Sequence, residues 1–174
     1  MKVLVLTGPE SSGKSWLARL IQQHFGGLVV GEYVRHFIDQ VRRDTCYGDI
    51  STIARGQLAW EDAARDAQPA LLILDTHLLS NLLWSRLLFG ECPAWIEPAL
   101  LARRYDLHLL LDPADVPWID DGQRCQPHLA ERQAFHQACQ SWLQAQRQVF
   151  EPLGGDWDTR RQAAFDCVER WLAG

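Results

Sequence analysis

The sequence predicts an α/β fold in which a five-stranded parallel sheet lies between two layers of helices, a three-layer sandwich. Short apolar runs alternate with segments of helical periodicity along the chain. Right-handed crossovers between such strands produce a parallel sheet covered on both faces. The chain has 174 residues, of which 47% are apolar and 22% charged, so we expect a single domain over residues 1–174.

The first half of the chain is expected to hold three strands separated by helices. "KVLVLT" is a β-branched apolar run, which is typical of a buried parallel strand. The helix after it carries apolar residues at helical spacing and is ended by Gly26 and Gly27. A third helix has Ser51 as its plausible cap. The expected strands are 2–7, 28–31 and 70–76, and the expected helices are 14–26, 32–44, 51–67 and 78–89.

The second half continues the alternation. "DLHLLLD" is a strongly apolar run, "VFEPL" is a weaker strand, and Pro93 opens a short helix. The segment 113–127 is polar, bounded by prolines and too long for a simple turn. The remaining expected elements are strands at 106–112 and 149–153 and helices at 128–148 and 158–172.

Composition excludes several classes of protein. The net charge is −5 without any basic block, which argues against a nucleic-acid groove. No apolar run approaches the ~18 residues that cross a bilayer, and the apolar start is too short for a signal peptide, so we expect a cytoplasmic protein without a membrane partner. Five widely spaced cysteines favour reduced, buried thiols over a zinc site or disulfides. The sequence leaves the oligomeric state open.

The loop after the first strand has the spacing of a phosphate-binding loop. "GPESSGKS", from Gly8 to Ser15, fits G-x-x-x-x-G-K-[ST] between a strand and a helix. Its amides and the helix dipole attract phosphate, Lys14 reaches the β- and γ-phosphates, and the Ser15 hydroxyl can bind Mg²⁺. The sequence therefore predicts a P-loop nucleoside triphosphate site for ATP and Mg²⁺. Its expected ATP-binding residues are Gly8, Glu10, Ser11, Ser12, Gly13, Lys14, Ser15, Trp16 and Trp157.

Two carboxylates follow apolar strands, where the carboxyl ends of a parallel sheet face the ligand. Asp75 ends "LLILD" and is expected to contact Mg²⁺; the alternative is a helix cap. Glu32 follows the second strand and could accept a proton from a hydroxyl acceptor, with Asp75 as the alternative base. Arg35 lies three residues further on, where it could hold a phosphate or fix Glu32, unless the two form an ordinary helical ion pair.

The segment "VPWIDDGQR" resembles a mobile cover of the kind that closes over small-molecule kinase sites. Arg124 could supply charge to the transferring phosphoryl group, Trp118 could lie on a flat ring, and Asp120 or Asp121 could bind ribose-type hydroxyls. A polar surface loop is the alternative. No N-K-x-D motif reads guanine and no room remains for the additional lid domain of an AAA-type motor, so neither a GTPase nor such a motor is favoured.

Read in order, "GPESSGKS", "EYVR", "IARGQ", "LILDT", "PWIDDGQR" and "GDWDTR" resemble the ribosylnicotinamide kinase domain of the bacterial NadR proteins over nearly the whole chain. The resemblance implies a nucleoside-kinase-like fold and transfer of the ATP γ-phosphate to the 5′-hydroxyl of nicotinamide riboside, giving nicotinamide mononucleotide in NAD salvage. It implies phosphate and Mg²⁺ roles for Gly13, Lys14, Ser15 and Asp75, and substrate roles for Glu32, Tyr33, Arg35, Trp118, Asp121 and Arg124. An adenylyltransferase domain, which precedes the kinase in many relatives, is expected to be absent.

Two positions depart from that family pattern. Gly31 stands where relatives often have an aromatic residue, and His77 stands where they often have a carboxylate after D-T. The expected function is therefore a small-molecule kinase with nicotinamide riboside as the first acceptor. The alternatives are a kinase of another nucleoside or small metabolite, or an ATP- or GTP-dependent binding switch.

Overall fold

The computed structural model describes all residues, 1–174, and contains one sheet of five strands. The strand order is β2-β3-β1-β4-β5, and every neighbouring pair is parallel. This confirms the α/β fold and the five-stranded parallel sheet that the sequence predicts. The strands are β1 (Lys2–Thr7), β2 (Leu28–Val30), β3 (Leu71–Asp75), β4 (Leu107–Leu111) and β5 (Phe150–Leu153).

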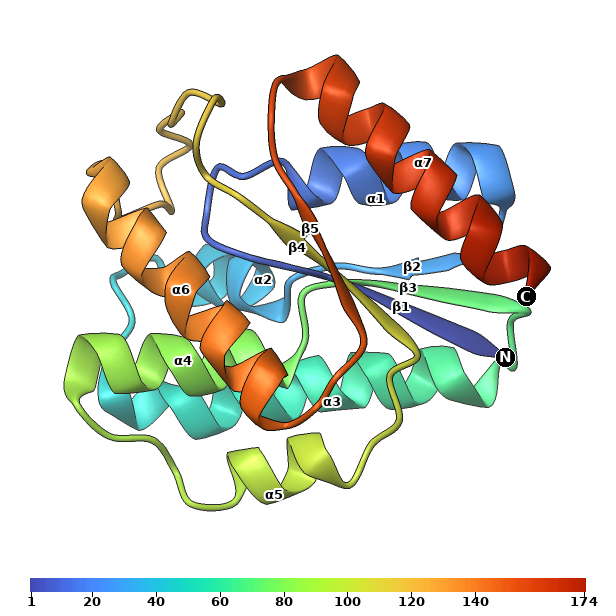
Figure 1. Cartoon of the computed structure of the whole chain (residues 1–174). Coiled ribbons are helices and arrows are strands. Elements are labelled where there is room, and N and C mark those ends of the chain that lie inside the picture. Colours follow the sequence, from blue (N-terminus) through green and yellow to red (C-terminus); the bar gives the residue numbers. More distant parts are fainter.

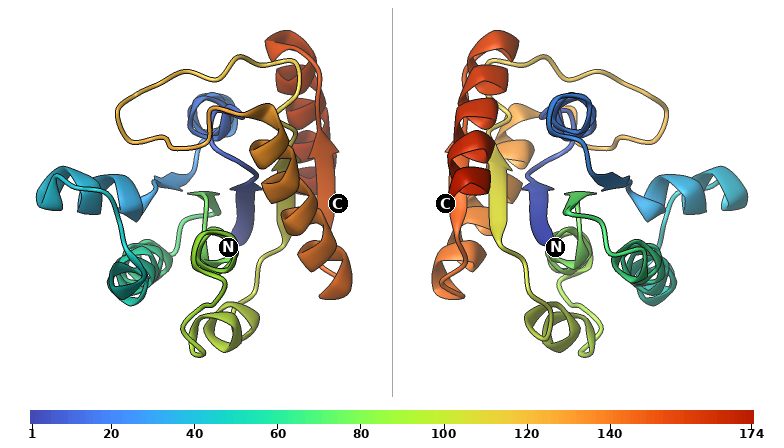
Figure 2. Two further views of the ribbon diagram at one scale, coloured as in Figure 1. Left: turned by 90° about the vertical axis from the view of Figure 1, so that its left-hand side faces the viewer. Right: turned by 90° about the vertical axis from the view of Figure 1, so that its right-hand side faces the viewer.

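Helices cover both faces of the sheet, so the fold has three layers (Figure 1). Helices α1 and α7 lie on one face, α3 to α6 lie on the other, and α2 lies beyond the β2 edge (Figures 1 and 2). The helices are α1 (Lys14–Phe25), α2 (Tyr33–Val41), α3 (Ile50–Asp66), α4 (Leu78–Phe89), α5 (Ile96–Leu101), α6 (Leu129–Ala145) and α7 (Trp157–Ala173), with a 3-10 turn at Tyr47–Asp49.

Alternate residues of the central strands supply two separate cores. In β1, Val3 and Val5 point into the core under α3 to α6, while Leu4 and Leu6 point into the core under α1 and α7. All residues of β3 and β4 are buried. A strand covered on both faces reads as a continuous apolar run, which is why these strands could be located from the sequence.

The ends of two helices differ from the prediction. Helix α3 begins at Ile50 with Asp49 as its N-cap residue, so Ser51 is not the cap; its hydroxyl instead accepts a hydrogen bond from the Trp95 indole at 3.1 Å. Helix α5 begins at Ile96 rather than at Pro93. Pro93 still shapes this entry, because its carbonyl accepts a hydrogen bond from the Ile96 amide.

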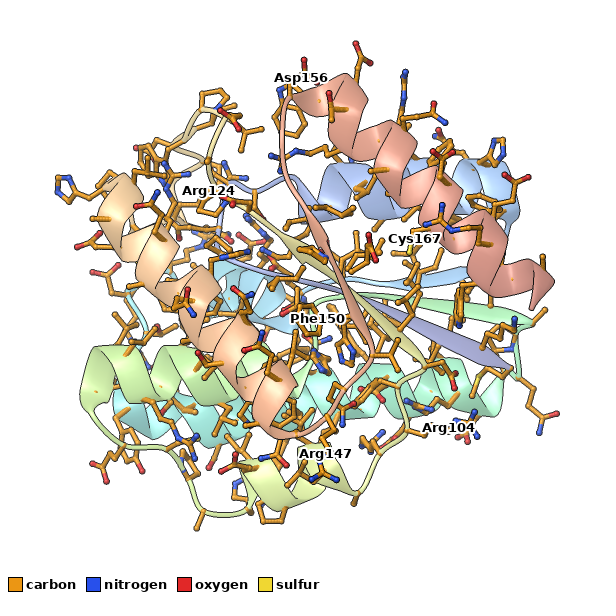
Figure 3. The ribbon with its side chains drawn as sticks, viewed as in Figure 1. Arg104, Arg124, Arg147, Phe150, Asp156 and Cys167 are labelled. Carbon is orange, nitrogen blue, oxygen red and sulfur yellow. The ribbon has the colours of Figure 1, made fainter.

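The topology brings the predicted site residues to the carboxyl edge of the sheet. The loop after β1 and the segment 112–128 both lie at this edge, and the segment arches over the amino end of α1 (Figure 2). Arg124 lies at this end of the molecule, whereas Arg104 and Arg147 lie at the opposite end (Figure 3).

All five cysteines are free thiols, but only Cys139 and Cys167 are buried; Cys46 and Cys125 are exposed, so the expected burial is wrong for these two. None of the helices combines the length and the apolar character that a membrane span needs.

Candidate active site

The loop from Gly8 to Ser15 depends on its two fixed glycines. Gly8 has φ +136°, and a Cβ added to it would lie 2.6 Å from the carbonyl oxygen of Leu111. Gly13, the N-cap residue of α1, has φ +93°, and its Cβ would lie 2.6 Å from the ring of Trp157. Both positions therefore need a residue without a side chain, for backbone conformation and for space.

Lys14 lies inside the loop rather than in solvent. Its side chain is 7% exposed, and its ammonium group donates to the carbonyls of Gly8 at 3.1 Å and Pro9 at 2.7 Å. The carboxylate of Glu32 lies 3.9 Å away. The loop thus holds one buried cation at the amino end of α1, where the helix dipole adds further positive potential.

Arg160 of α7 stabilises this loop through hydrogen bonds to backbone carbonyls, a role that the sequence analysis missed. Its guanidinium is fully buried and donates only to backbone carbonyls: to Ser12 at 2.7 Å, to Asp112 and Ala114 at 3.2 Å, and to Gly155 at 2.7 Å. One side chain of α7 therefore joins the glycine loop to the end of β4 and to the turn before α7. The only sequence signal was its place in "GDWDTR".

Asp75 lies buried at the end of β3 beside the loop. Its Oδ1 has no hydrogen-bond partner, and the Ser15 side chain lies close enough to the carboxylate to favour its ionised form. Burial, aided by the nearby charge of Glu32, raises the pKa of Asp75 to about 6, although Lys14 opposes this shift. His77, not Asp75, is the N-cap residue of α4, so the alternative role of Asp75 as a helix cap is wrong.

The residues present at this position fit a magnesium ion. A buried carboxylate oxygen without a partner, next to a serine hydroxyl, offers two of the oxygen ligands that Mg²⁺ prefers. No group of three or more His, Cys, Asp or Glu side chains could enclose a metal. This suits Mg²⁺, which usually binds through one or two protein oxygens together with phosphate and water.

Glu32 is held in place by two neighbours. Arg35 donates to its carboxylate at 2.8 Å, and Gln57 of α3, 2% exposed, holds the turn that carries it. The Gln57 side chain accepts from the Tyr33 amide at 2.8 Å and donates to the Gly31 carbonyl at 3.1 Å, on either side of Glu32. The helical ion pair between Arg35 and Glu32 exists, and Arg35 also reaches Asp121 at 2.8 Å.

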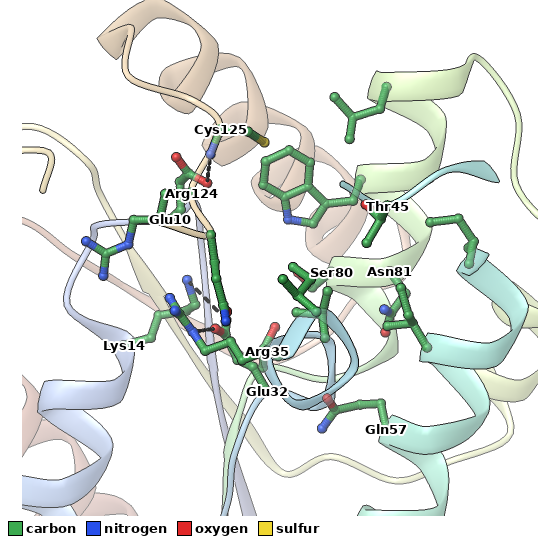
Figure 4. Close-up of a pocket in the computed structure, with 18 residues that line it drawn as sticks. Glu10, Lys14, Glu32, Arg35, Thr45, Gln57, Ser80, Asn81, Arg124 and Cys125 are labelled. Atoms are coloured by element: carbon green, nitrogen blue, oxygen red, sulfur yellow. Dashed lines mark hydrogen bonds and ion pairs between the residues drawn. The ribbon is translucent and has the colours of Figure 1, made fainter. Parts of the chain in front are cut away.

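Two cavities meet at this edge of the sheet. One is bordered by the glycine loop, Trp16 and Trp157, and the other lies among α2, α3 and α4 (Figure 4). The residues that border both are all charged: Glu10, Lys14, Glu32, Arg35 and Arg124. A phosphoryl group crossing from one cavity to the other would pass between these side chains.

The second cavity has apolar walls and a few polar groups, a composition typical of small-molecule sites. Sequence reasoning did not single out its polar side chains, although Gln57 lies within the quoted "IARGQ". The polar residues are Thr45, Gln57, Ser80 and Asn81, and the apolar walls include Val34, Ile38, Ile50, Ile53, Trp84 and Leu88. Their signal in the sequence is weak because the four polar residues come from α3, α4 and the loop after α2, and the sequence does not state how these parts pack together.

The segment between β4 and α6 brings Arg124 to the boundary of the two cavities, as expected. Arg124 donates to the Ile119 carbonyl at 2.6 Å and pairs with Asp121 at 3.2 Å. Asp120 accepts only from the Gly122 amide within the same segment. Trp118 borders neither cavity; its indole donates to Glu10 at 2.8 Å. The expectation that Trp118 lies on a substrate ring is not supported by this placement.

Three other expected positions can be compared with the structure. Trp157 borders the cavity at the glycine loop and contacts Trp16 edge-on, with ring centroids 4.9 Å apart. Tyr33 borders neither cavity, because its ring packs on Gly56 and lies 4.9 Å from that of Trp60. His77 is fully buried and turned toward Tyr105, 4.6 Å between ring centroids, and burial lowers its pKa well below the ordinary value.

The loop, its buried lysine and the 2-3-1-4-5 parallel sheet define a P-loop nucleoside triphosphate-binding protein of the nucleoside-kinase fold. The model of a family described as "AAA domain" matches residues 3–160, and the chain belongs to that family. The match covers the P-loop domain. It does not test the prediction that this chain lacks the additional lid domain of AAA-type motors.

Individual relatives agree with the resemblance noted from the motifs. The chain is 26% identical over 179 residues to the trifunctional NAD biosynthesis/regulator protein NadR of Salmonella typhimurium LT2, covering 99% of this chain and 43% of that protein. The chain therefore spans less than half the length of this relative. The NadR protein of Escherichia coli K12 is 24% identical, with 42% of its length covered.

Solved structures show the same fold. A crystal structure of NadR protein in complex with NR matches 99% of this chain and 52% of its own, with a TM-score of 0.82 and 23% identity. A structure of deoxyadenosine kinase from M. mycoides with bound dATP matches 97% of this chain and 100% of its own, with a TM-score of 0.64 and 13% identity. These likenesses define the P-loop kinase fold and leave the acceptor to the argument below.

Proposed function

We propose that this chain is an ATP-dependent kinase that transfers the γ-phosphate to the 5′-hydroxyl of nicotinamide riboside, giving nicotinamide mononucleotide. One observation carries the proposal: a cavity at the P-loop and a cavity with apolar walls meet at a boundary formed only by charged residues. A phosphoryl donor and a small acceptor in the two cavities would face one another there. The similarity to the NadR proteins, one of which is described in complex with NR, supports this acceptor.

In the proposed reaction, the loop amides and Lys14 hold the β- and γ-phosphates. Arg124, which borders both cavities, would balance negative charge as the phosphoryl group moves between them. Most of the rate would come from positioning and electrostatics, because phosphoryl transfer needs little covalent chemistry from the protein.

Glu32 is the proposed base for the acceptor hydroxyl. Its carboxylate borders both cavities and is 14% exposed, whereas Asp75 borders neither. Arg35 and Gln57 hold Glu32 in place, so it would accept the proton without a large rearrangement.

Ser15 and Asp75 are the proposed ligands of Mg²⁺. When bound, the ion would neutralise charge on the β- and γ-phosphates. Asp75 is suited to this role because its buried Oδ1 lacks a partner, and Ser15 because it lies in the first turn of α1 beside the carboxylate. His77 is not proposed as a ligand, since its ring is fully buried against Tyr105 and borders neither cavity.

The segment 113–127 is the proposed lid of a single kinase domain over 1–174. It crosses from the P-loop to α2, where Asp121 pairs with Arg35 and Gln123 donates to Asp39 at 2.6 Å. A cover in this position would keep water from the γ-phosphate and favour the bound acceptor over hydrolysis.

A second candidate is a kinase of another nucleoside. Gly31 is the observation that favours it, because it departs from the aromatic residue often found at this position in the family that the chain resembles, and a Cβ here would meet nothing within 4 Å. Gly31 itself borders neither cavity, although its neighbour Glu32 borders both. The likeness to deoxyadenosine kinase concerns the fold alone and fits either acceptor.

The proposal is tested by measuring ADP release from ATP and Mg²⁺ with a panel of acceptors: nicotinamide riboside, adenosine, deoxyadenosine, cytidine, uridine, and no acceptor. We expect nicotinamide riboside to give the highest kcat/KM. A higher value with another nucleoside would favour the second candidate. Slow hydrolysis that no acceptor stimulates would instead indicate a nucleotide-dependent binding switch.

A further inference from the structure

Glu10, in the third position of the glycine loop, makes its side-chain hydrogen bonds outside that loop. Its carboxylate instead accepts three hydrogen bonds from the segment 113–127. Oε1 accepts from the Trp118 indole at 2.8 Å and from the Gln126 amide at 2.6 Å, and Oε2 accepts from the Cys125 amide at 3.1 Å. These partners lie 108 to 116 residues away in the sequence.

A second side chain of the loop strengthens this attachment. The Ser11 hydroxyl accepts from the Ile119 amide at 3.2 Å. Two consecutive P-loop side chains therefore hold the segment at two places, residues 118–119 and residues 125–126. A carboxylate that accepts three N–H donors makes stronger bonds than a neutral acceptor would.

Arg124 lies inside the stretch that is bound in this way. On one side of Arg124, the amide of the next residue, Cys125, donates to Glu10. The Arg124 guanidinium donates to the carbonyl of Ile119 at 2.6 Å, and the amide of Ile119 donates to Ser11. The position of the Arg124 guanidinium between the two cavities thus depends on contacts that Glu10 and Ser11 make.

We infer that Glu10 is a positioning residue: it fastens the segment 113–127 to the P-loop and so holds Arg124 at the boundary of the two cavities. The expected contact between Glu10 and ATP stays a prediction, since Glu10 also borders the cavity at the glycine loop. The inference rests on the proposed kinase function for its kinetic consequence, but the fastening itself can be measured without any activity. The P-loop would bind the triphosphate and also holds the segment 113–127. Binding of the triphosphate and the position of the segment would therefore affect each other.

The fastening is tested by residue-resolved amide hydrogen exchange on the full chain. Glu10→Ala should raise exchange at Cys125 and Gln126 by about tenfold or more, because each of these amides loses its only acceptor. Ser11→Ala should raise exchange at Ile119 instead. If exchange at Cys125 and Gln126 is unchanged in Glu10→Ala, the inference is wrong.

The control variant is Glu131→Gln, which removes an exposed carboxylate. Glu131 lies close enough to Cys125 to raise the pKa of its thiol, but it makes no hydrogen bond to the segment. It should leave exchange at Cys125 and Gln126 as in the wild type. Equal increases in the control and in Glu10→Ala would mean that general loss of negative charge, not the specific bonds, governs the segment, and would also overturn the inference.

The kinetic test uses Glu10→Gln, which keeps the size of the side chain and one acceptor oxygen. We expect kcat for transfer to fall by about tenfold, ATP affinity to stay within about twofold, and the ratio of hydrolysis to transfer to rise. A loss of ATP affinity with unchanged kcat would show that Glu10 binds nucleotide directly. If the wild type transfers phosphate to no acceptor, the proposed function fails while the exchange experiment still decides the role of Glu10.

Discussion

Replacing Asp75 by asparagine should make the protein more stable at neutral pH while abolishing its proposed activity. The wild-type carboxylate is 5% exposed, and its pKa of about 6 lies about two pH units above the ordinary value of 3.8. Each pH unit corresponds to about 1.36 kcal/mol, so ionised Asp75 costs the folded state about 3 kcal/mol at most. The amide side chain of the variant would carry no charge and would still offer an oxygen to Ser15.

The sign of the pH dependence follows from the raised pKa. Below about pH 4, Asp75 is protonated in both the folded and the unfolded chain, so the variant gains no advantage over the wild type. Between about pH 4 and pH 6 the unfolded chain releases the proton more readily than the folded chain, and the wild type loses stability relative to Asp75→Asn. Above about pH 6 the difference is constant.

The assay is urea unfolding of both proteins, followed by tryptophan fluorescence, at about pH 4 and about pH 7.5. We expect the free energy of unfolding of Asp75→Asn, minus that of the wild type, to grow by about 2 kcal/mol between these pH values. Asp158→Asn, at a side chain 86% exposed, controls for the removal of a surface charge. A difference that is independent of pH, or a variant less stable at pH 7.5, would refute the reasoning.

Three further substitutions test other parts of the site. Lys14→Ala should lower transfer by orders of magnitude while the domain stays folded by circular dichroism, because it removes the one cation inside the loop. Glu32→Gln should leave ATP affinity by calorimetry intact and slow transfer by about a hundredfold; unchanged turnover would mean that Glu32 is not the base. Arg160→Met should lower the free energy of unfolding by about 3 kcal/mol or more, since four backbone carbonyls lose a charged donor. The control is Arg161→Met, on the exposed side of α7, which should change the free energy of unfolding by less than about 0.5 kcal/mol.

Local sequence patterns were sufficient for the fold and for the phosphate site. Strands buried on both faces are continuous apolar runs, so β3 and β4 were placed to within one residue at each end. The glycine loop is formed by eight consecutive residues, and its geometry depends on contacts that lie close together in the chain. Glu32 and Asp75 were found because the carboxyl ends of parallel strands face the same edge.

Side chains whose partners are distant in the sequence were not predictable in this way. Gln57 lies in the middle of α3, and only the packing of α3 against α2 shows that it holds the turn around Glu32. The sequence suggested a substrate ring as the partner of Trp118. The indole instead donates to Glu10, which lies 108 residues earlier, and no pattern near Trp118 indicates that partner. Arg160 likewise acts on the P-loop from 148 residues away.

The measurement that tests the central claim most directly is the fate of the γ-phosphate. The protein would be incubated with Mg²⁺, nicotinamide riboside and ATP labelled in its γ-phosphate, and the products separated and identified by mass. The account predicts label in nicotinamide mononucleotide in equal amount to the ADP formed, and none with Lys14→Ala. Label recovered only as inorganic phosphate, whether or not the riboside is present, would contradict it.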